Sequence, residues 1–176
     1  RRRMVCGVHV HVGMRDGEHA MATINGMLPY LPHLLALSAS SPFWQGTDTG
    51  LASSRITIFE ALPTAGHPCT FRDWSDFERV HDAMIASRAI TSIKDIWWDI
   101  RPNPNYGTIE VRICDGLPSL TETTALVALM HALCARLDVR YAAGERLTPL
   151  PQWVLRENKW RASRWGRQAD ILLDSA

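Results

Sequence analysis

The chain has 176 residues, of which 46% are hydrophobic and 21% are charged, and its formal net charge is +1. A chain of this length buries a core as one ordinary globular domain. The near-neutral charge gives no general attraction to nucleic acid or to acidic membranes, and no apolar run reaches the roughly 20 residues of a membrane helix. We therefore expect neither nucleic acid nor a membrane as a partner.

The predicted elements alternate between strand, helix and loop. Pro29 and Pro32 separate the first two helices, because proline cannot continue a helix interior. Asp73 is the predicted cap of the third helix, and Ser119 with Glu122 forms a capping box that opens the fourth. The elements in chain order are a strand 3–12, helices 16–28 and 32–40, a loop 41–50, a short strand 56–59, a helix 73–90, strands 96–101 and 108–114 around a Pro-Asn-Pro-Asn-Tyr-Gly turn, and helices 119–141 and 152–164. Strands separated by helices, with a hairpin among them, indicate an α+β fold.

The start of the chain and the four cysteines indicate whether the chain is a fragment and in which compartment the protein works. Cys6, Cys69, Cys114 and Cys134 show no Cys-x-x-Cys spacing, and no secretory signal precedes them. Such cysteines indicate reduced thiols in a cytoplasmic protein. The basic residues 1–3 lead into a strand rather than into an apolar targeting segment. Because the chain opens on Arg and enters its first strand at once, we expect a fragment of a longer protein.

Two predicted strands alternate strictly between two chemistries. Valines alternate with His9 and His11 in the first, and isoleucine and valine alternate with Glu110 and Arg112 in the last. Successive strand side chains point to opposite faces, so each strand presents one apolar and one polar face. If the strands share a sheet, the polar faces form a surface for a divalent cation and an anion.

These residues also have a purely structural interpretation. A His-x-His pair alone is a weak metal signal, Glu110 and Arg112 could lie on a solvated face, and Arg112 could pair with Asp115. However, Asp99 and Arg101 share one face of a third strand. An exposed sheet face more usually mixes in Thr, Ser and Lys, so the recurrence of charge favours a functional surface.

The segment 156–167 is basic with interleaved tryptophans, a form that nucleic-acid-binding helices take. The near-zero net charge argues against that partner, and a local anion site for phosphate or a carboxylate fits better. The sequence has no Gly-rich phosphate loop. A nucleotide would therefore bind through metal and arginines on a sheet.

Five segments together resemble a known family. The chain is similar, from about residue 4 to 170, to the C-terminal portion of the carboxylate–amine ligases of the type 2 glutamate–cysteine ligase family. More distantly, the Gly-x-His-x-His and Ile-Glu-x-Arg strands are similar to those of glutamine synthetases. The five segments are GVHVHVG (7–13), SSPFWQGTDTG (40–50), WWDIRP (97–102), GTIEVR (107–112) and ENKWRA (157–162).

The resemblance implies a glutamine-synthetase-like catalytic domain, with an antiparallel curved sheet and helices packed on one side, of which residues 1–176 form a part. It also implies that ATP phosphorylates a carboxylate and that an amine attacks the acyl phosphate to give an amide. The implied cofactors are ATP and Mg²⁺ or Mn²⁺. The implied substrates are glutamate or another carboxylate and an amino-acid amine, which the sequence does not specify as cysteine.

The same resemblance assigns roles to residues. Dissociative phosphoryl transfer needs positioning and charge neutralisation, which arginine forks and divalent ions supply. The implied metal ligands are His9 and Glu110. The implied catalytic residues are Arg101 and Arg112, the nucleotide-binding residues His11, Arg101, Lys159 and Arg161, and the substrate-binding residues Trp44, Arg55 and Arg112.

The chain departs from the family in one respect. The family begins with a strand carrying a Glu-Glu-Glu cluster that supplies further metal ligands, and this acidic strand is absent here. We therefore expect an incomplete metal site, no activity from these 176 residues alone, and an unpaired strand edge that allows a homo-oligomer. The alternative is a catalytically silent metal- or nucleotide-binding domain. A zinc hydrolase built on His9 and His11 comes third, because no further His-rich motif or general base accompanies them.

Overall fold

The computed structural model describes residues 6–174, and the chain is α+β as predicted. The helices are α1 (Gly17–Met27), α2 (Leu31–Ser38), α3 (Ser54–Phe59), α4 (Trp74–Ala86), α5 (Leu120–Ala142) and α6 (Gln152–Trp165), with short 3₁₀ turns η1 (Leu28–Tyr30), η2 (Ile93–Asp95), η3 (Pro104–Tyr106) and η4 (Gly166–Gln168). The strands are β1 (Val10–Gly13), β2 (Phe43–Trp44), β3 (Thr47–Asp48), β4 (Ala65–Gly66), β5 (Trp97–Trp98), β6 (Ile100–Asn103) and β7 (Thr108–Val111).

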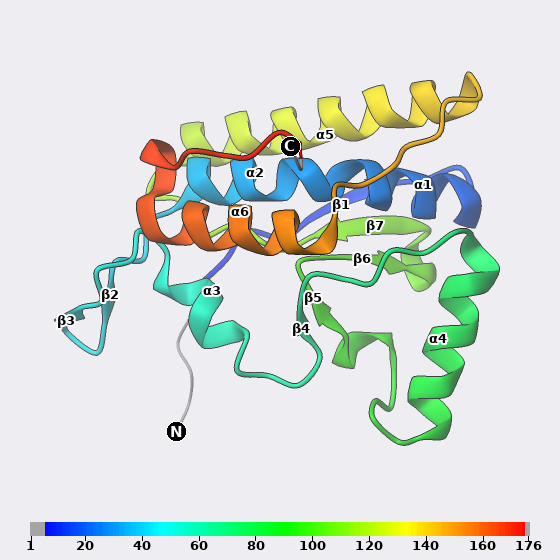
Figure 1. Ribbon diagram of the computed structural model, residues 1–176, viewed down its shortest axis with the longest axis horizontal. Coiled ribbons are helices and arrows are strands. Elements are labelled where there is room, and N and C mark those ends of the chain that lie inside the picture. The colour runs from blue at the N-terminus through cyan, green and yellow to red at the C-terminus, as the bar shows by residue number, and fades with distance from the viewer. Residues whose placement is uncertain (1–5, 175–176) are drawn as a thin grey trace.

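The central sheet has three antiparallel strands in the order β1-β7-β6. Strands β4 and β5 form a short parallel pair, and β2 and β3 form a hairpin. In Figure 1, α1, α2 and α5 lie above the central sheet and α6 packs against α2, whereas α3 and most of α4 lie below the level of the sheet. One face of the sheet is therefore covered by the long helices.

The core lies between that face and the helices. Val10, Val12, Ile109 and Val111 are buried, and α1 packs against both the sheet and α5. On β1 the buried valines alternate with exposed residues, which confirms the predicted division into two faces. The polar side chains are consequently held on the face that these helices leave open.

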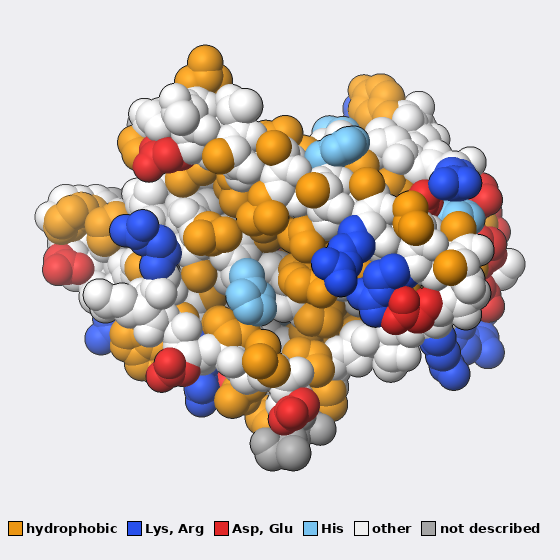
Figure 2. Space-filling model, turned by 90° about the horizontal axis from the view of Figure 1, so that it is seen from above, with side chains coloured by type: hydrophobic (Ala, Val, Ile, Leu, Met, Phe, Trp, Pro, Cys, Tyr) orange, Lys and Arg blue, Asp and Glu red, His pale blue; other side chains and the backbone are white. Residues whose placement is uncertain are grey.

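The outer surface of the helical layer is largely apolar. Figure 2, which views the molecule from above, shows hydrophobic side chains spread over the middle of this surface, with the charged side chains mainly toward its edges. The large exposed hydrophobic side chains of α5 are Leu120, Leu129 and Val139.

The caps predicted at Asp73 and Ser119 both form, and Asp16 caps a further helix. The Ser119 side chain accepts a hydrogen bond from the backbone N–H of Glu122 at 3.2 Å and begins α5. The Asp16 side chain accepts a hydrogen bond from the backbone N–H of His19 at 2.8 Å and begins α1. Asp73 accepts from the N–H of Asp76 at 2.7 Å and begins α4. These bonds satisfy N–H groups that have no partner inside the helix.

The structure corrects two local predictions. Residues 56–59 are not a strand: they belong to α3, where Ile56 is buried and Arg55 stacks over Phe59, with its Cζ atom 5.4 Å from the ring centroid. Helical i,i+4 spacing makes this contact, and tertiary packing outweighs the β-branched character of the segment. The strand predicted over 96–101 divides into β5 and β6, which belong to different sheets. The start of the predicted first strand, residues 3–5, lies outside the described residues.

All four cysteines are free thiols. Burial raises the pKa of both Cys114 and Cys134 to about 12, so these thiols stay protonated at neutral pH. Among residues 6–174, no helix combines the length and the apolar character needed to cross a membrane.

Candidate functional site

The polar face of the central sheet gathers the residues that the strand pattern singled out. The register places His11 opposite Glu110 on one side and Arg101 opposite Glu110 on the other. His9 and Arg112 add their side chains to the same group, because Nη1 of Arg112 lies 3.2 Å from Nδ1 of His9. We call these five residues the Glu110 cluster.

Glu110 is the centre of this cluster. Its Oε2 atom accepts a hydrogen bond from Nε of Arg101 at 2.9 Å, and its Oε1 atom accepts one from Nη1 of Arg112. Nδ1 of His9 lies 3.2 Å from Oε1, and Nε2 of His11 lies 3.8 Å from it. Burial alone would raise the pKa of Glu110, but His9, Arg112 and Arg101 outweigh burial and hold that pKa well below its usual range.

Arg101 joins the cluster to a neighbouring segment. Its Nη1 atom donates to the carbonyl oxygens of Ile93 at 2.9 Å, Lys94 at 3.2 Å and Ile96 at 2.6 Å. The Arg101 side chain is buried, so these bonds fix its guanidinium in one place. Arg101 therefore holds Glu110 in position and anchors η2 to the sheet.

Arg112 has hydrogen-bonding capacity to spare. Its guanidinium lies over the Trp97 ring, with Cζ 5.7 Å from the centroid, and its buried Nε atom has no hydrogen-bond partner among the described residues. Burial lowers the pKa of Arg112, although Glu110 opposes that effect. An unsatisfied, oriented N–H of this kind is suited to an anionic ligand oxygen.

The two histidines form the accessible edge of the cluster. The side chains of His9 and His11 are each 37% exposed, whereas that of Glu110 is 4% exposed. A hydrogen bond of 2.9 Å between Nδ1 of His11 and Oγ1 of Thr108 leaves Nε2 facing Glu110, and the ring of Tyr106 meets His11 edge-on. A ligand would reach the buried charges past these imidazoles.

The cluster does not make a complete site for a hard divalent cation. Mg²⁺ prefers several oxygen ligands, and Glu110 is the one carboxylate in the cluster, with both oxygens already hydrogen-bonded to arginines. Within residues 6–174, no three histidine, cysteine, aspartate or glutamate side chains are placed to hold a metal ion. These residues alone do not fit Mg²⁺ or Mn²⁺.

The substrate-binding candidates Arg55 and Trp44 line a pocket of about 140 Å³. The buried Arg55 donates to the carbonyl oxygens of Ile113 and Arg112, each at 3.1 Å, and its Nη1 atom lies 4.0 Å from Asp115. Burial lowers the pKa of Arg55, with Asp115 opposing. Arg55 thus supports the backbone at Arg112, while its own side chain faces a separate pocket.

Asp115 has its own set of partners and does not pair with Arg112. It accepts hydrogen bonds from the hydroxyls of Ser41 and Ser53, at 2.7 and 2.9 Å, and from the backbone N–H of Ser40 at 3.0 Å. This set fastens the segment before β2 to the end of the sheet. The interpretation of Glu110 and Arg112 as a solvated face is also wrong, because both side chains are buried.

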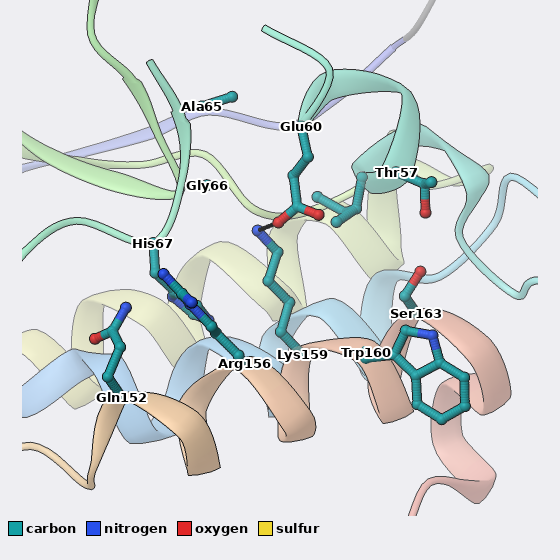
Figure 3. A pocket seen from close by; sticks show the side chains of 11 residues that line it. Thr57, Glu60, Ala65, Gly66, His67, Gln152, Arg156, Lys159, Trp160 and Ser163 are labelled. Carbon is teal, nitrogen blue, oxygen red and sulfur yellow. Dashed lines mark ion pairs between the residues drawn. The ribbon is translucent and has the colours of Figure 1, made fainter. Parts of the chain in front are cut away.

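The nucleotide candidates Lys159 and Arg161 both lie on α6 but have different partners. Nζ of Lys159 is buried and lies 2.6 Å from carboxylate oxygens of both Glu60 and Asp99, and Figure 3 shows the pair with Glu60. Arg161 instead donates to Glu157 at 2.7 Å and to the carbonyl oxygen of Asp170 at 3.1 Å. Asp99 therefore forms its ion pair with Lys159 and does not belong to the Glu110 cluster.

Sequence reasoning missed His67 and Glu60, which complete the surroundings of Lys159. Glu60 directly follows the predicted strand 56–59, His67 belongs to no predicted element, and nothing local marks either residue. The signal available was indirect: Asp99 lies on a strand and Lys159 on a helix, and buried charges of this kind need partners.

Comparisons with known proteins identify the family of the chain. The family model "Glutamate-cysteine ligase family 2 (GCS2)" matches residues 1–176. Similar proteins provisionally named glutamate–cysteine ligase 2 include one of Bdellovibrio bacteriovorus, 55% identical over 175 residues, and one of Mycobacterium ulcerans, 53% identical over 175 residues. A protein of Frankia alni, provisionally named glutamate–cysteine ligase 2-1, is 52% identical over 174 residues.

Each alignment covers 99% of this chain but only 46%, 45% and 46% of the respective relative. The chain thus spans about half the length of the curated relatives it matches. With the family model matching from end to end, the chain belongs to glutamate–cysteine ligase family 2.

Proposed function

We propose that the full-length protein is an ATP-dependent carboxylate–amine ligase with a glutamine-synthetase-like catalytic fold, most simply one that joins glutamate to cysteine. The Glu110 cluster carries this proposal. It collects two arginines, one carboxylate and two imidazoles on the open face of an otherwise apolar sheet. Membership of the ligase family supports the same reaction class.

The chemistry of an acyl phosphate suits these residues. Transfer of a phosphoryl group to a carboxylate brings two anions together, so the site must neutralise and orient them. The Nε–H of Arg112 has no hydrogen-bond partner within residues 6–174, and the side chain is held between Glu110 and the Trp97 ring. We assign to Arg112 the role of donating to an oxygen of the transferred phosphate or of the substrate carboxylate.

Arg101 has a more indirect role in this proposal. Because three carbonyl oxygens and Glu110 surround its guanidinium, Arg101 positions Glu110, and Glu110 in turn orients Arg112. His9 and His11, at the exposed edge, would contact the nucleotide or its metal ion. Trp44 and Arg55, which line the pocket on the far side of the Arg112 backbone, would contact the substrate there.

The proposal includes a divalent metal ion, on the condition that further residues help to bind it. Mg²⁺ or Mn²⁺ would accompany ATP, but the described residues do not hold it alone. We propose that oxygen ligands from outside residues 6–174 complete the ion's coordination, and that the 176-residue chain without them is inert. We also propose that the protein works in the cytoplasm, in keeping with its four free cysteines.

A second candidate is a catalytically silent domain of the same fold that binds a nucleotide or metal. The observation that favours it is the engagement of both Glu110 oxygens by arginines, which leaves little capacity for a cation. Turnover by the full-length protein distinguishes the two functions.

Calorimetry of ATP binding with Mg²⁺ tests the location of the site. The full-length wild-type protein, its Glu110→Gln variant and a Glu78→Gln control on α4 are titrated under the same conditions. We expect about tenfold or greater loss of affinity for Glu110→Gln, because Arg112 loses its charged partner, and no change for the control. Equal affinity in all three proteins would place ATP away from the Glu110 cluster.

A further inference from the structure

Helix α5 is the outermost helix of the helical layer, at the top of the molecule in Figure 1. Its inner side packs mainly against α1. The buried side chains of that inner side recur every three or four residues and therefore lie on one face of the helix. They are Leu126, Met130, Cys134 and Leu137. The opposite side of α5 is exposed.

This outer side of α5 is uncharged along its middle, and it belongs to the largely apolar surface that Figure 2 faces. From Thr123 to Ala135 the sequence contains no Asp, Glu, Lys or Arg. Leu129 is 40% exposed, and Val139, one turn beyond Ala135, is 62% exposed. A helix that is apolar on all sides is normally buried, because the solvent side of a surface helix carries charged residues. The outer side of α5 therefore has the character of an interface.

The exposed residues along this side have the spacing of a helix–helix contact. Intervals of three and four residues place them on one line, as the a and d positions of a heptad repeat do. We call this line, with Leu129 beside it, the α5 seam. Its residues are Thr121, Ala125, Ala128, Ala132, Ala135 and Val139, and all of them are exposed. Their side chains are short, so a second helix can approach closely.

Two opposite charges lie on the same flank of the α5 seam. Glu122, Leu129 and Arg136 follow one another at intervals of seven residues, so Leu129 is midway between the two charges. Neither Glu122 nor Arg136 forms an ion pair with another residue of the described range 6–174, and the nearby Glu145 pairs with Arg140 instead. Both charges are therefore open to a partner outside this chain.

We propose that the α5 seam binds the α5 seam of a second copy of this chain, as an antiparallel pair with its two-fold axis at Leu129. A two-fold axis presents the same surface on both sides of the interface. Because Leu129 lies midway between the charges, each Glu122 then faces Arg136 of the other copy, and each Leu129 meets its counterpart. A parallel pair would place Arg136 beside Arg136 and Glu122 beside Glu122, and like charges oppose that arrangement.

The oligomeric state of the 176-residue chain tests this proposal. Sedimentation velocity from about 1 µM to about 1 mM gives the dimer dissociation constant, and circular dichroism confirms that each variant is folded. The variants are Leu129→Glu, Glu122→Arg, Arg136→Glu and the double charge reversal, with Arg167→Glu in η4 as the control outside the seam. Glu122→Arg keeps the backbone N–H that Ser119 caps, and Leu129→Glu and Arg136→Glu change exposed residues outside the cap. The test therefore does not depend on one variant alone.

We expect the wild-type chain to dimerise with a Kd of about 10 µM, because one helix pair is a small interface. Leu129→Glu and each single reversal should weaken the dimer about tenfold or more, since each places like charges across the axis. The double reversal should restore the Kd to within about threefold of the wild type, and the control should not change it.

Three results would overturn the proposal. The first is a wild-type chain that stays monomeric over the whole concentration range. The second is a dimer that Leu129→Glu leaves unchanged, which would place the contact elsewhere, such as on the free edge of β1. The third is a double reversal no tighter than the single reversals. That result would show that α5 meets a surface other than itself, such as the part of the full-length protein outside these 176 residues.

Discussion

Arg101 and Glu110 face each other across the β6–β7 pair, with Nε of the arginine 2.9 Å from Oε2 of the carboxylate and both side chains buried. This pair fixes the carboxylate from one side, and Arg112 binds it from the other. The orientation of Arg112 thus depends on a carboxylate that the sheet register holds in place.

Replacing Arg112 by lysine should leave the fold intact and remove most of the turnover of the full-length protein. Lysine keeps the charge but lacks the planar fork and the Nε–H, so we expect about a hundredfold or greater loss of rate. Steady-state ADP release measures it, with Arg167→Lys as the control. A folded Arg112→Lys enzyme with near wild-type turnover would show that no bidentate contact is needed.

Glu110→Gln should destabilise the 176-residue chain substantially. The substitution leaves Arg101 and Arg112 buried without their counter-charge, a loss of about 3–5 kcal/mol in the free energy of unfolding. Urea unfolding at neutral pH gives the value, and the exposed Glu78→Gln is the control. A difference under about 1 kcal/mol would mean that the arginines find other partners.

The same substitution should change the response to acid. The folded pKa of Glu110 is below the unfolded value of about 4.3, so its stabilisation is fully present above that pH and is lost as the pH falls toward the folded pKa. The stability difference between the wild type and Glu110→Gln should therefore shrink below about pH 4. Unfolding curves at several acidic pH values measure this difference, and one that stays constant would contradict the ionised state of Glu110.

Gly7 should tolerate no side chain, because the Arg55 guanidinium lies against it. A Cβ atom on Gly7 would lie 2.4 Å from Nη2 of Arg55, which is held by two carbonyl oxygens. We expect Gly7→Ala to cost about 1–3 kcal/mol in unfolding free energy. Gly13→Ala is the matched control, since a Cβ atom on Gly13 would meet no other part of the described chain within 4 Å. Equal stabilities would show that Arg55 moves aside freely.

The 176-residue chain alone should release no ADP with glutamate and cysteine. Its described residues supply Glu110, already bonded to two arginines, and no set of three metal ligands. A cation held so weakly would not support phosphoryl transfer. Steady turnover by the purified chain, at a rate that Arg112→Lys abolishes, would refute this account of the metal site.

The sequence predicts the parts of the fold that depend on local chemistry. Period-two alternation places His11 and Glu110 on one face, and Asp16 and Asp73 mark true helix starts. The strand predicted over 56–59 is wrong because periodicity does not distinguish a strand from a helix in so short an apolar run. In the structure this segment is helical, and Arg55 packs on Phe59 at helical spacing.

Only those site residues whose positions follow from strand alternation and register can be predicted from the sequence. The alternation predicts Arg101 on the polar face with Glu110, but the three carbonyl partners of Arg101 come from in and around η2, which no motif marks. The family resemblance predicts Lys159 as a site residue, yet its partners Glu60 and Asp99 come from elements distant in sequence. Such contacts follow from tertiary packing, which a single sequence does not encode locally.

Trapping of the acyl phosphate tests the proposed reaction most directly. The full-length protein is incubated with ATP, Mg²⁺, glutamate and hydroxylamine, which attacks an acyl phosphate to release phosphate and form a hydroxamate. The proposal predicts glutamyl hydroxamate and ADP in equal amounts, both dependent on glutamate and both lost in Arg112→Lys. A folded protein that binds ATP but releases ADP without hydroxamate, or yields neither product, would contradict it.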